Sequence, residues 1–368
     1  MDKNISLPVY LKISQIILGL IGFFFVLYVG QTIILPLIFS LLIAILLNPL
    51  VNFLHGIGCN RIIAILISIL LGFFLITGIC YFLISQATSF TDSFPQIQIK
   101  FNHLIDDIIK WISQTFNVSI KKVNDWLAKQ RNDGLDSTTS VIRQTLTTIS
   151  GMFVTVFLVP VYVFMFLFYK TLLLQFISML FPRGKQHDVG DVLTASKSLI
   201  QNYLVGLLAE AAIVAALNSA GLLILGIDYA ILLGIIGAIL NVIPYIGGII
   251  AIALPMLIAL ATKTPASALW VFVAYMIVQF IDNHYIVPYI VASRVKINAL
   301  VSIVVVLIGG TLWGIPGMFL SIPLTAIIKV ILDRIEPLKP FGFLLGDTMP
   351  PIGKNIFNFK MKKSAKGK

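Results

Sequence analysis

Long apolar blocks separated by shorter polar stretches dominate the pattern of hydrophobic and polar positions along the chain. A helix needs about 20 mostly apolar residues to cross a bilayer core. Lipid offers the backbone no hydrogen-bonding partner, so apolar blocks of this length predict membrane helices. The sequence therefore predicts an all-α polytopic integral membrane protein with eight apolar segments, at residues 13–29, 33–54, 62–85, 149–181, 199–227, 229–261, 266–291 and 300–332.

Residues 86–148 break this pattern and predict a small helical insertion outside the membrane. Its first part repeats apolar residues at helical spacing, as an amphipathic helix does: Phe101, Leu104, Ile105, Ile108 and Ile112. The insertion is either a small capping subdomain or a gate, partner surface or segment resting on the membrane. The expected organisation is three membrane helices (1–85), this insertion (86–148), a C-terminal membrane core (149–335) and a basic tail (336–368).

Composition agrees with the pattern. Hydrophobic residues make up 58% of the 368 positions and charged residues only 11%, whereas a soluble domain has about 25% charged residues. The mean hydropathy is +1.01. These values exclude a water-soluble fold of this size.

The net charge of +11 is interpreted as the excess of Lys and Arg that cytoplasmic loops carry, and no nucleic-acid partner is expected. A basic tail that ends in Lys366 and Lys368 predicts a cytoplasmic C-terminus. With the N-terminus also inside, the 86–148 insertion lies outside. The expected location is a bacterial inner membrane, with the bilayer as the main surrounding partner.

Two of the apolar segments, 229–261 and 300–332, are interrupted near their middle by helix breakers. The first contains Asn241, Pro244, Tyr245, Gly247 and Gly248, and the second contains Gly309, Gly310, Gly314, Pro316 and Gly317. Proline removes a backbone donor and glycine weakens the helix. Broken backbone at membrane depth persists only where protein buries it or water reaches it.

Each interrupted segment is either a kinked span or a re-entrant hairpin of two half-helices. The hairpin alternative places Arg294 and Lys296 inside and Lys263 outside, and the eight-span alternative reverses this. Paired Gly/Pro-interrupted segments in the two halves of a chain indicate a transporter's substrate site. We therefore assign substrate binding to the ten breaker-region residues named above, although glycines that only allow close helix packing are the structural alternative.

Polar residues inside the apolar segments are candidates for ion or proton coupling. Glu210 lies near the middle of its segment, where a carboxylate is costly unless it faces a protein interior or a water cavity. Gln279, Asp282 and Asn283 are spaced i, i+3, i+4, which places them on one helix face with His284 adjacent. These five residues are the predicted coupling group. Structural hydrogen bonding and interfacial capping are the alternatives.

The same residues carry a family resemblance. The run Leu225–Gly234, continued through Asn241–Gly248, resembles the autoinducer-2 exporter (AI-2E) family of permeases. The later stretch agrees through Asp282, Pro288, the Gly309–Gly310 pair, Gly314, Gly317 and Pro323. The resemblance implies export of a small signal-type metabolite or sodium/proton exchange, and a homo-oligomer. It carries function onto Asn241, Pro244, Gly247, Gly248, Asp282, Gly310, Gly314 and Gly317, but not onto His284.

Motifs of enzymes and ATP-driven pumps are missing. The sequence has no G-x-x-x-x-G-K-[ST] phosphate-binding loop, no H-E-x-x-H and no G-x-S-x-G. We expect neither an enzyme nor a cofactor or metal. The leading hypothesis is a secondary transporter for a small solute or a cation. A channel-like pore and a non-transporting membrane scaffold are the alternatives.

Overall fold

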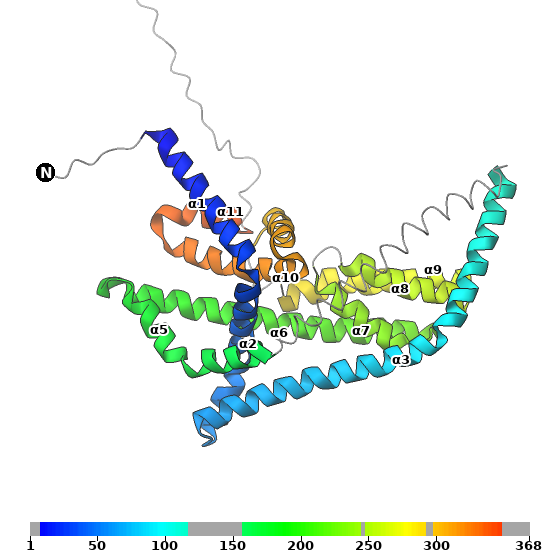
Figure 1. Ribbon diagram of the computed structural model, residues 1–368, viewed down its shortest axis with the longest axis horizontal. Helices are drawn as coiled ribbons and strands as arrows, with labels where there is room; N and C mark the ends of the chain where they lie inside the picture. The colour runs from blue at the N-terminus through cyan, green and yellow to red at the C-terminus, as the bar shows by residue number, and fades with distance from the viewer. Residues whose placement is uncertain (1–7, 117–156, 244–246, 292–296, 348–368) are drawn as a thin grey trace, which may run out of the picture.

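The computed structural model describes residues 8–116, 157–243, 247–291 and 297–347, and every regular element within these ranges is helical. The all-α prediction is confirmed. Figure 1 shows the central helix α6 (Gln186–Ile224) extending through the molecule, with later helices of the chain alongside one half of it and the first two helices crossing the other half. At 39 residues α6 is roughly 58 Å long, well beyond a bilayer core of about 30 Å. Helices from both the N-terminal and the C-terminal parts of the chain pack against it.

The N-terminal part consists of α1 (Val9–Val29), α2 (Gln31–Gly56) and α3 (Arg61–Phe116). The expected boundary at residue 85 lies inside α3, which continues unbroken for 56 residues. The third apolar segment and the first amphipathic helix of the insertion are therefore one helix, which Figure 1 shows curving at its far end. The rest of the insertion, from residue 117, lies outside the described residues.

The fourth apolar segment is bent. Its two described pieces, Phe157–Phe168 and α5 (Lys170–Met179), meet at an angle of 64°. A single-turn 3₁₀ helix, η1 (Arg183–Lys185), connects α5 to α6. The bend lies at Tyr169, whereas Pro160 is inside the first piece and leaves it helical.

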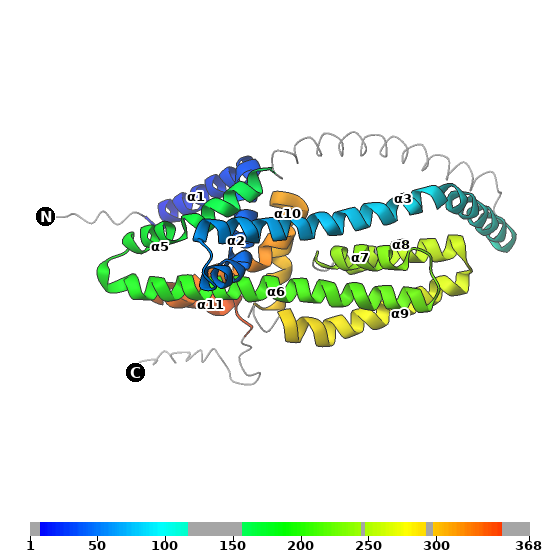
Figure 2. The same cartoon turned by 90° about the horizontal axis from the view of Figure 1, so that it is seen from below.

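The C-terminal part begins with two short helices, α7 (Ala230–Asn241) and α8 (Gly247–Thr262). Next come α9 (Pro265–Ile281) and a π-helical continuation, η2 (Asp282–Val291). The chain then forms α10 (Ala299–Arg334), the 3₁₀ helix η4 (Glu336–Leu338) and α11 (Lys339–Leu345). Figure 2 shows α7 and α8 lying alongside α6 and α9.

Packing along α6 divides the interior into two main groups. Toward its C-terminal end, Leu222 packs with Leu233 of α7, Ala259 of α8 and Val271 of α9. Toward its N-terminal half, Ile200 and Tyr203 pack with Leu42 of α2 and with Trp313 and Leu320 of α10. The buried positions of α6 recur at helical spacing, so that one face of this helix serves both groups.

Five described helices are long and apolar enough to cross a membrane, or six if the bent pair is one span. The count of eight is not confirmed. Residues 230–241 and 250–262 form helices too short to cross alone. The apolar part of the first segment, Ile13–Val29, is also too short by the same measure. The shortfall therefore comes from this short first segment and from the break that divides residues 229–261 into two helices.

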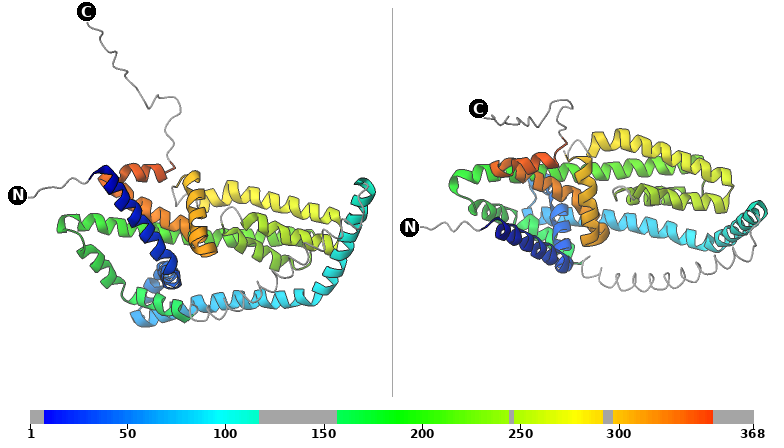
Figure 3. Two further views of the ribbon diagram at one scale, coloured as in Figure 1. Left: turned by 45° about the horizontal axis from the view of Figure 1, so that its top comes forward. Right: turned by 90° about the horizontal axis from the view of Figure 1, so that it is seen from above.

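The segment after α10 returns to the start of that helix. Asn298, the N-cap of α10, accepts a hydrogen bond from the Val301 amide (2.9 Å) and donates to the carbonyl oxygens of Leu344 (2.7 Å) and Gly346 (3.1 Å). Figure 3 shows α11 lying alongside α10. The two ends of α10 therefore lie on the same side of the molecule. The predicted tail starts at residue 336, but its first part forms η4 and α11 and packs back on α10.

Asn298→Ala removes all three of these hydrogen bonds. An N-cap contributes about 1 kcal/mol and each further hydrogen bond roughly 0.5–1.5 kcal/mol. We expect a loss of about 2–3 kcal/mol in the free energy of local unfolding, seen as faster proteolysis after Arg334 in detergent. Asn202→Ala is the control, because Asn202 is exposed and its side chain donates to the Ser198 hydroxyl within its own helix. Equal cleavage rates in the two variants would contradict this role.

Candidate functional site

The first interrupted segment is a helical hairpin. Its arms, α7 and α8, contain 12 and 16 residues. A Cβ built on Gly237 of α7 would lie 3.6 Å from Cβ of Ala251 of α8, and one on Gly248 would lie 3.5 Å from Oδ1 of Asn241. These pairs are symmetric about the break at residues 242–246, so the arms lie side by side. At the turn, a Cβ on Gly247 would overlap the Leu240 carbonyl group, which is why glycine is required there.

The second interrupted segment also folds back on itself. Gly314 has φ 64° and ψ −143°, a conformation that divides α10 into two arms. A Cβ on Gly309 would overlap the Ser321 hydroxyl and the Gly317 carbonyl oxygen. Residues 309 and 321 would be roughly 18 Å apart in a straight helix. Of the two alternatives left open by the sequence, the geometry of both segments favours hairpins over kinked spans, because the two arms of each segment are in contact.

A group of polar side chains lies at the turn of the first hairpin. Asp282, at the junction of α9 and η2, is 1% exposed. Its Oδ2 accepts a hydrogen bond of 2.8 Å from Nδ2 of Asn241, the last residue of α7. Its other oxygen, Oδ1, is buried and has no hydrogen-bond partner among the described residues. One carboxylate oxygen is thus available to a ligand.

Two further side chains complete this group, which we call the carboxylate cluster: Glu210, Asn241, Gln279 and Asp282. Oε1 of Gln279 lies 3.0 Å from the position of a Cβ on Gly248. Glu210 of α6 is 7% exposed and interacts electrostatically with Asp282 and with Tyr203. Two negative charges in apolar surroundings repel strongly, and a proton or a cation held between them removes the repulsion. The cluster has the chemistry of a cation or proton site.

Asn283 and His284 are not brought into the carboxylate cluster. The helix changes from α to π at Asp282, which alters the angle between successive residues. Asn283 is exposed although Asp282 next to it is buried. The exposed His284 ring stacks on Phe280, with centroids 4.2 Å apart, and its Nδ1 lies 3.0 Å from the Phe280 carbonyl oxygen. The shared face expected from the i, i+3, i+4 spacing therefore ends at Asp282.

The second hairpin, which contains the remaining predicted glycines and a proline, packs against a different part of α6 from the first hairpin. Trp313, next to the turn at Gly314, packs with Ile200 and Tyr203 and donates a hydrogen bond of 3.0 Å to the Leu27 carbonyl oxygen of α1. Gly309, Gly310, Gly314, Pro316 and Gly317 all belong to this hairpin. Glu210 lies between the two hairpins along α6, because Tyr203 packs with the second and Val214 packs with Ala238 of the first. Pro244 and Tyr245 lie outside the described residues.

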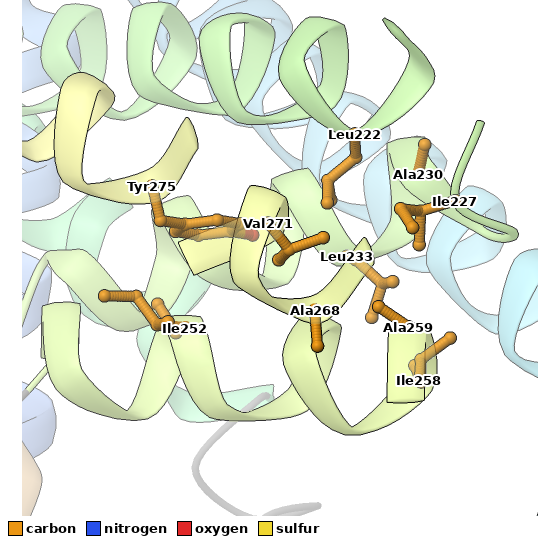
Figure 4. Packing of buried hydrophobic residues seen from close by; sticks show 11 residues of the cluster. Leu222, Ile227, Ala230, Leu233, Ile252, Ile258, Ala259, Ala268, Val271 and Tyr275 are labelled. Atoms are coloured by element: carbon orange, nitrogen blue, oxygen red, sulfur yellow. The ribbon is translucent and has the colours of Figure 1, made fainter. Parts of the chain in front are cut away.

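Two buried polar residues were not singled out from the sequence. Asn218 of α6 and Tyr275 of α9 are each 4% exposed, and both flank Gly237 of α7. Neither Oδ1 of Asn218 nor the Tyr275 hydroxyl has a hydrogen-bond partner among the described residues. Figure 4 shows Tyr275 within the apolar packing between these helices. The sequence did contain a signal for them, because residues four or eight positions apart lie on the same face of a helix. Asn218 follows Glu210 by eight residues, and Tyr275 precedes Gln279 by four.

Comparison with known proteins identifies the class to which this arrangement belongs. The sequence model of a protein family, described as "AI-2E family transporter", matches residues 17–336. The chain belongs to the AI-2E transporter family. This confirms the resemblance drawn from residues 225–325. AI-2E membership and the apolar helices make this a multi-pass membrane protein of a transport family.

Individual AI-2E relatives match over nearly the whole chain. "Putative transport protein YrrI" of Bacillus subtilis is 27% identical over 352 residues, which cover 90% of this chain and 97% of the relative. A "Putative transport protein" of Haemophilus influenzae is 28% identical over 358 residues, covering 94% and 99%. "Putative permease PerM" of Escherichia coli K12 is 26% identical over 306 residues, covering 81% and 86%.

Proposed function

We propose that this AI-2E family protein is a secondary transporter that exports or exchanges a small solute or a cation across the bacterial inner membrane. Movement of a proton or monovalent cation at the carboxylate cluster would drive it. Both termini are proposed to be cytoplasmic. The observation that carries the proposal is Asp282, a fully buried carboxylate with one oxygen bonded to a hairpin turn and the other unbonded among the described residues.

The position of the carboxylate cluster supports coupling. Asn241 ends α7, so its hydrogen bond to Asp282 ties the turn of the first hairpin to α9. A proton or cation that binds the free Oδ1 of Asp282 withdraws negative charge from Oδ2 and so weakens the hydrogen bond from Asn241. Occupancy of the site is thereby linked to the position of the hairpin, which is what alternating access at a broken helix requires.

Charge supports a cation more than an anion as the coupling species. Glu210 and Asp282 interact electrostatically, and Asn241 and Gln279 add neutral amide groups. In the described part of the chain, no Lys or Arg forms an ion pair with either carboxylate. An anionic solute here would meet two like charges, whereas a proton or a small cation would neutralise them.

Flux in proteoliposomes tests the proposal. We expect vesicles containing the purified protein and a lumenal pH dye to show a pH change when Na⁺ or K⁺ is added outside, with a rate that saturates. Asn283→Ala/His284→Ala should keep the wild-type rate, because both side chains lie outside the carboxylate cluster. Single-channel currents in planar bilayers would instead establish the channel alternative. If the dye signal after addition of Na⁺ and of K⁺ were the same in protein-containing and empty vesicles, coupling of proton movement to either cation gradient would be overturned.

A further inference from the structure

Three basic side chains gather where α2, α3, the bent pair and α6 meet. The guanidinium of Arg61, the first residue of α3, donates a hydrogen bond of 2.9 Å from Nη2 to the Leu167 carbonyl oxygen. The Lys170 ammonium donates one of 3.0 Å to Oδ1 of Asn48 in α2. Lys170 also interacts electrostatically with both Arg61 and Lys197 of α6. We call Arg61, Lys170 and Lys197 the basic cluster.

The basic cluster has no acidic partner in the described part of the chain. The ion pairs formed there by other lysines and arginines are Lys329–Asp333, Lys339–Glu336 and Arg334–Asp191. All three side chains of the basic cluster are half-buried, so water screens their mutual repulsion less than at an open surface. Asn48 and the Leu167 carbonyl are neutral acceptors and do not cancel the charge. Three like charges held together in this way favour the binding of an anion.

The surroundings show which anion is suitable. Arg61 directly follows the turn between two membrane helices, which places the basic cluster near one membrane surface. An open apolar pocket of about 390 Å³ lies at the same bend, lined by Leu37 of α2 and by side chains around Tyr169. Tyr169 lines the pocket and its neighbour Lys170 belongs to the basic cluster. Cationic and apolar surfaces thus adjoin.

We propose that the basic cluster binds the phosphate of an anionic phospholipid, with an acyl chain of the same lipid in the pocket at Tyr169. Basic pockets between membrane helices are suited to acidic lipid headgroups. Arg61 contributes a planar guanidinium that can bind two phosphate oxygens, and the two lysines add point charges. The bound lipid would join α2, α3, the bent pair and α6 at one place. This inference does not depend on the proposed transport activity.

Native mass spectrometry of the full-length protein in detergent tests the proposal. The probes are dioleoylphosphatidylglycerol, dioleoylphosphatidylcholine and inorganic phosphate, each titrated separately. Each basic residue near an anionic lipid surface contributes about fivefold in affinity. We therefore expect Arg61→Gln/Lys197→Gln to bind phosphatidylglycerol on the order of 30-fold more weakly than wild type, with little change for phosphatidylcholine. Arg183→Gln/Lys185→Gln is the matched control, because it removes the same two charges at exposed positions outside the basic cluster.

The three probes distinguish a lipid site from a general charge effect and from a site for a free anion. Weaker phosphatidylglycerol binding in the basic-cluster variant alone supports the proposal. Equal loss in the control pair would show a general charge effect and overturn it. Tight binding of inorganic phosphate without preference for phosphatidylglycerol would make this a site for a free anion, which also overturns it. If the double variant does not fold, Lys197→Gln alone should weaken binding by about fivefold, and unchanged affinity would contradict the proposal.

Discussion

Asp282→Asn is expected to abolish cation-coupled flux while leaving the protein folded. Asparagine has nearly the same shape as aspartate and keeps an oxygen that can accept the hydrogen bond from Asn241. What it loses is the negative charge that a proton or cation would neutralise. Removing the carboxylate from a buried carboxylate–cation pair costs about 2–5 kcal/mol of binding free energy, so the rate at limiting cation concentration should fall by at least roughly 30-fold. Flux in proteoliposomes measures this loss.

Glu210→Gln tests the other carboxylate in the same assay. Because Glu210 and Asp282 interact electrostatically, removing either charge should lower the rate of cation-coupled flux. The double variant should have the same rate as the slower of the two single variants, since both residues act in one site. The control is Asp228→Asn, the same chemical change at an exposed position between α6 and α7. It should retain wild-type flux. Wild-type rates in Asp282→Asn would exclude the carboxylate cluster as the coupling site.

Gly309→Ala should lower the stability of the protein more than Gly310→Ala, its neighbour in α10. A Cβ at Gly309 would overlap both the Gly317 carbonyl oxygen and the Ser321 hydroxyl, and the first of these is backbone that cannot move aside easily. Overpacking of this kind costs about 1–3 kcal/mol. We expect a lower midpoint in thermal unfolding followed by size-exclusion chromatography in detergent.

Two other glycines provide controls for Gly309→Ala. At Gly310 a new Cβ would meet mainly the terminal Met318 methyl group, which is flexible, so the loss should be smaller. At Gly78 of α3 a Cβ would meet nothing within 4 Å. Gly78→Ala should therefore be neutral or stabilising by up to about 1 kcal/mol through helix propensity. If Gly309→Ala were as stable as Gly78→Ala, the two arms of α10 could not be folded together as described.

Local properties of the chain were predictable from the sequence. The membrane class follows from long apolar blocks and few charges, because both reflect the solvent that each segment meets. The positions of the breaks follow from glycine and proline, because they act on the backbone where they occur: α7 ends at Asn241, and Gly314 divides α10. Glu210 and Asp282 were identifiable as candidates because a carboxylate in an apolar block is costly.

Only the tertiary structure decided which of these residues meet. Asn241 and Asp282 are 41 positions apart, and no local pattern links them. The change from α to π helix at Asp282 leaves Asn283 and His284 exposed, although their spacing alone favoured a shared face. Whether an interrupted segment continues or turns back depends on packing between its arms, as at Gly309 and Gly317, and not on the breaker itself. The sequence by itself determined where glycine and proline interrupt the two broken segments and which side chains are costly in lipid. The bend at Tyr169 and the convergence of Glu210, Asn241 and Asp282 were determined by tertiary packing around α6.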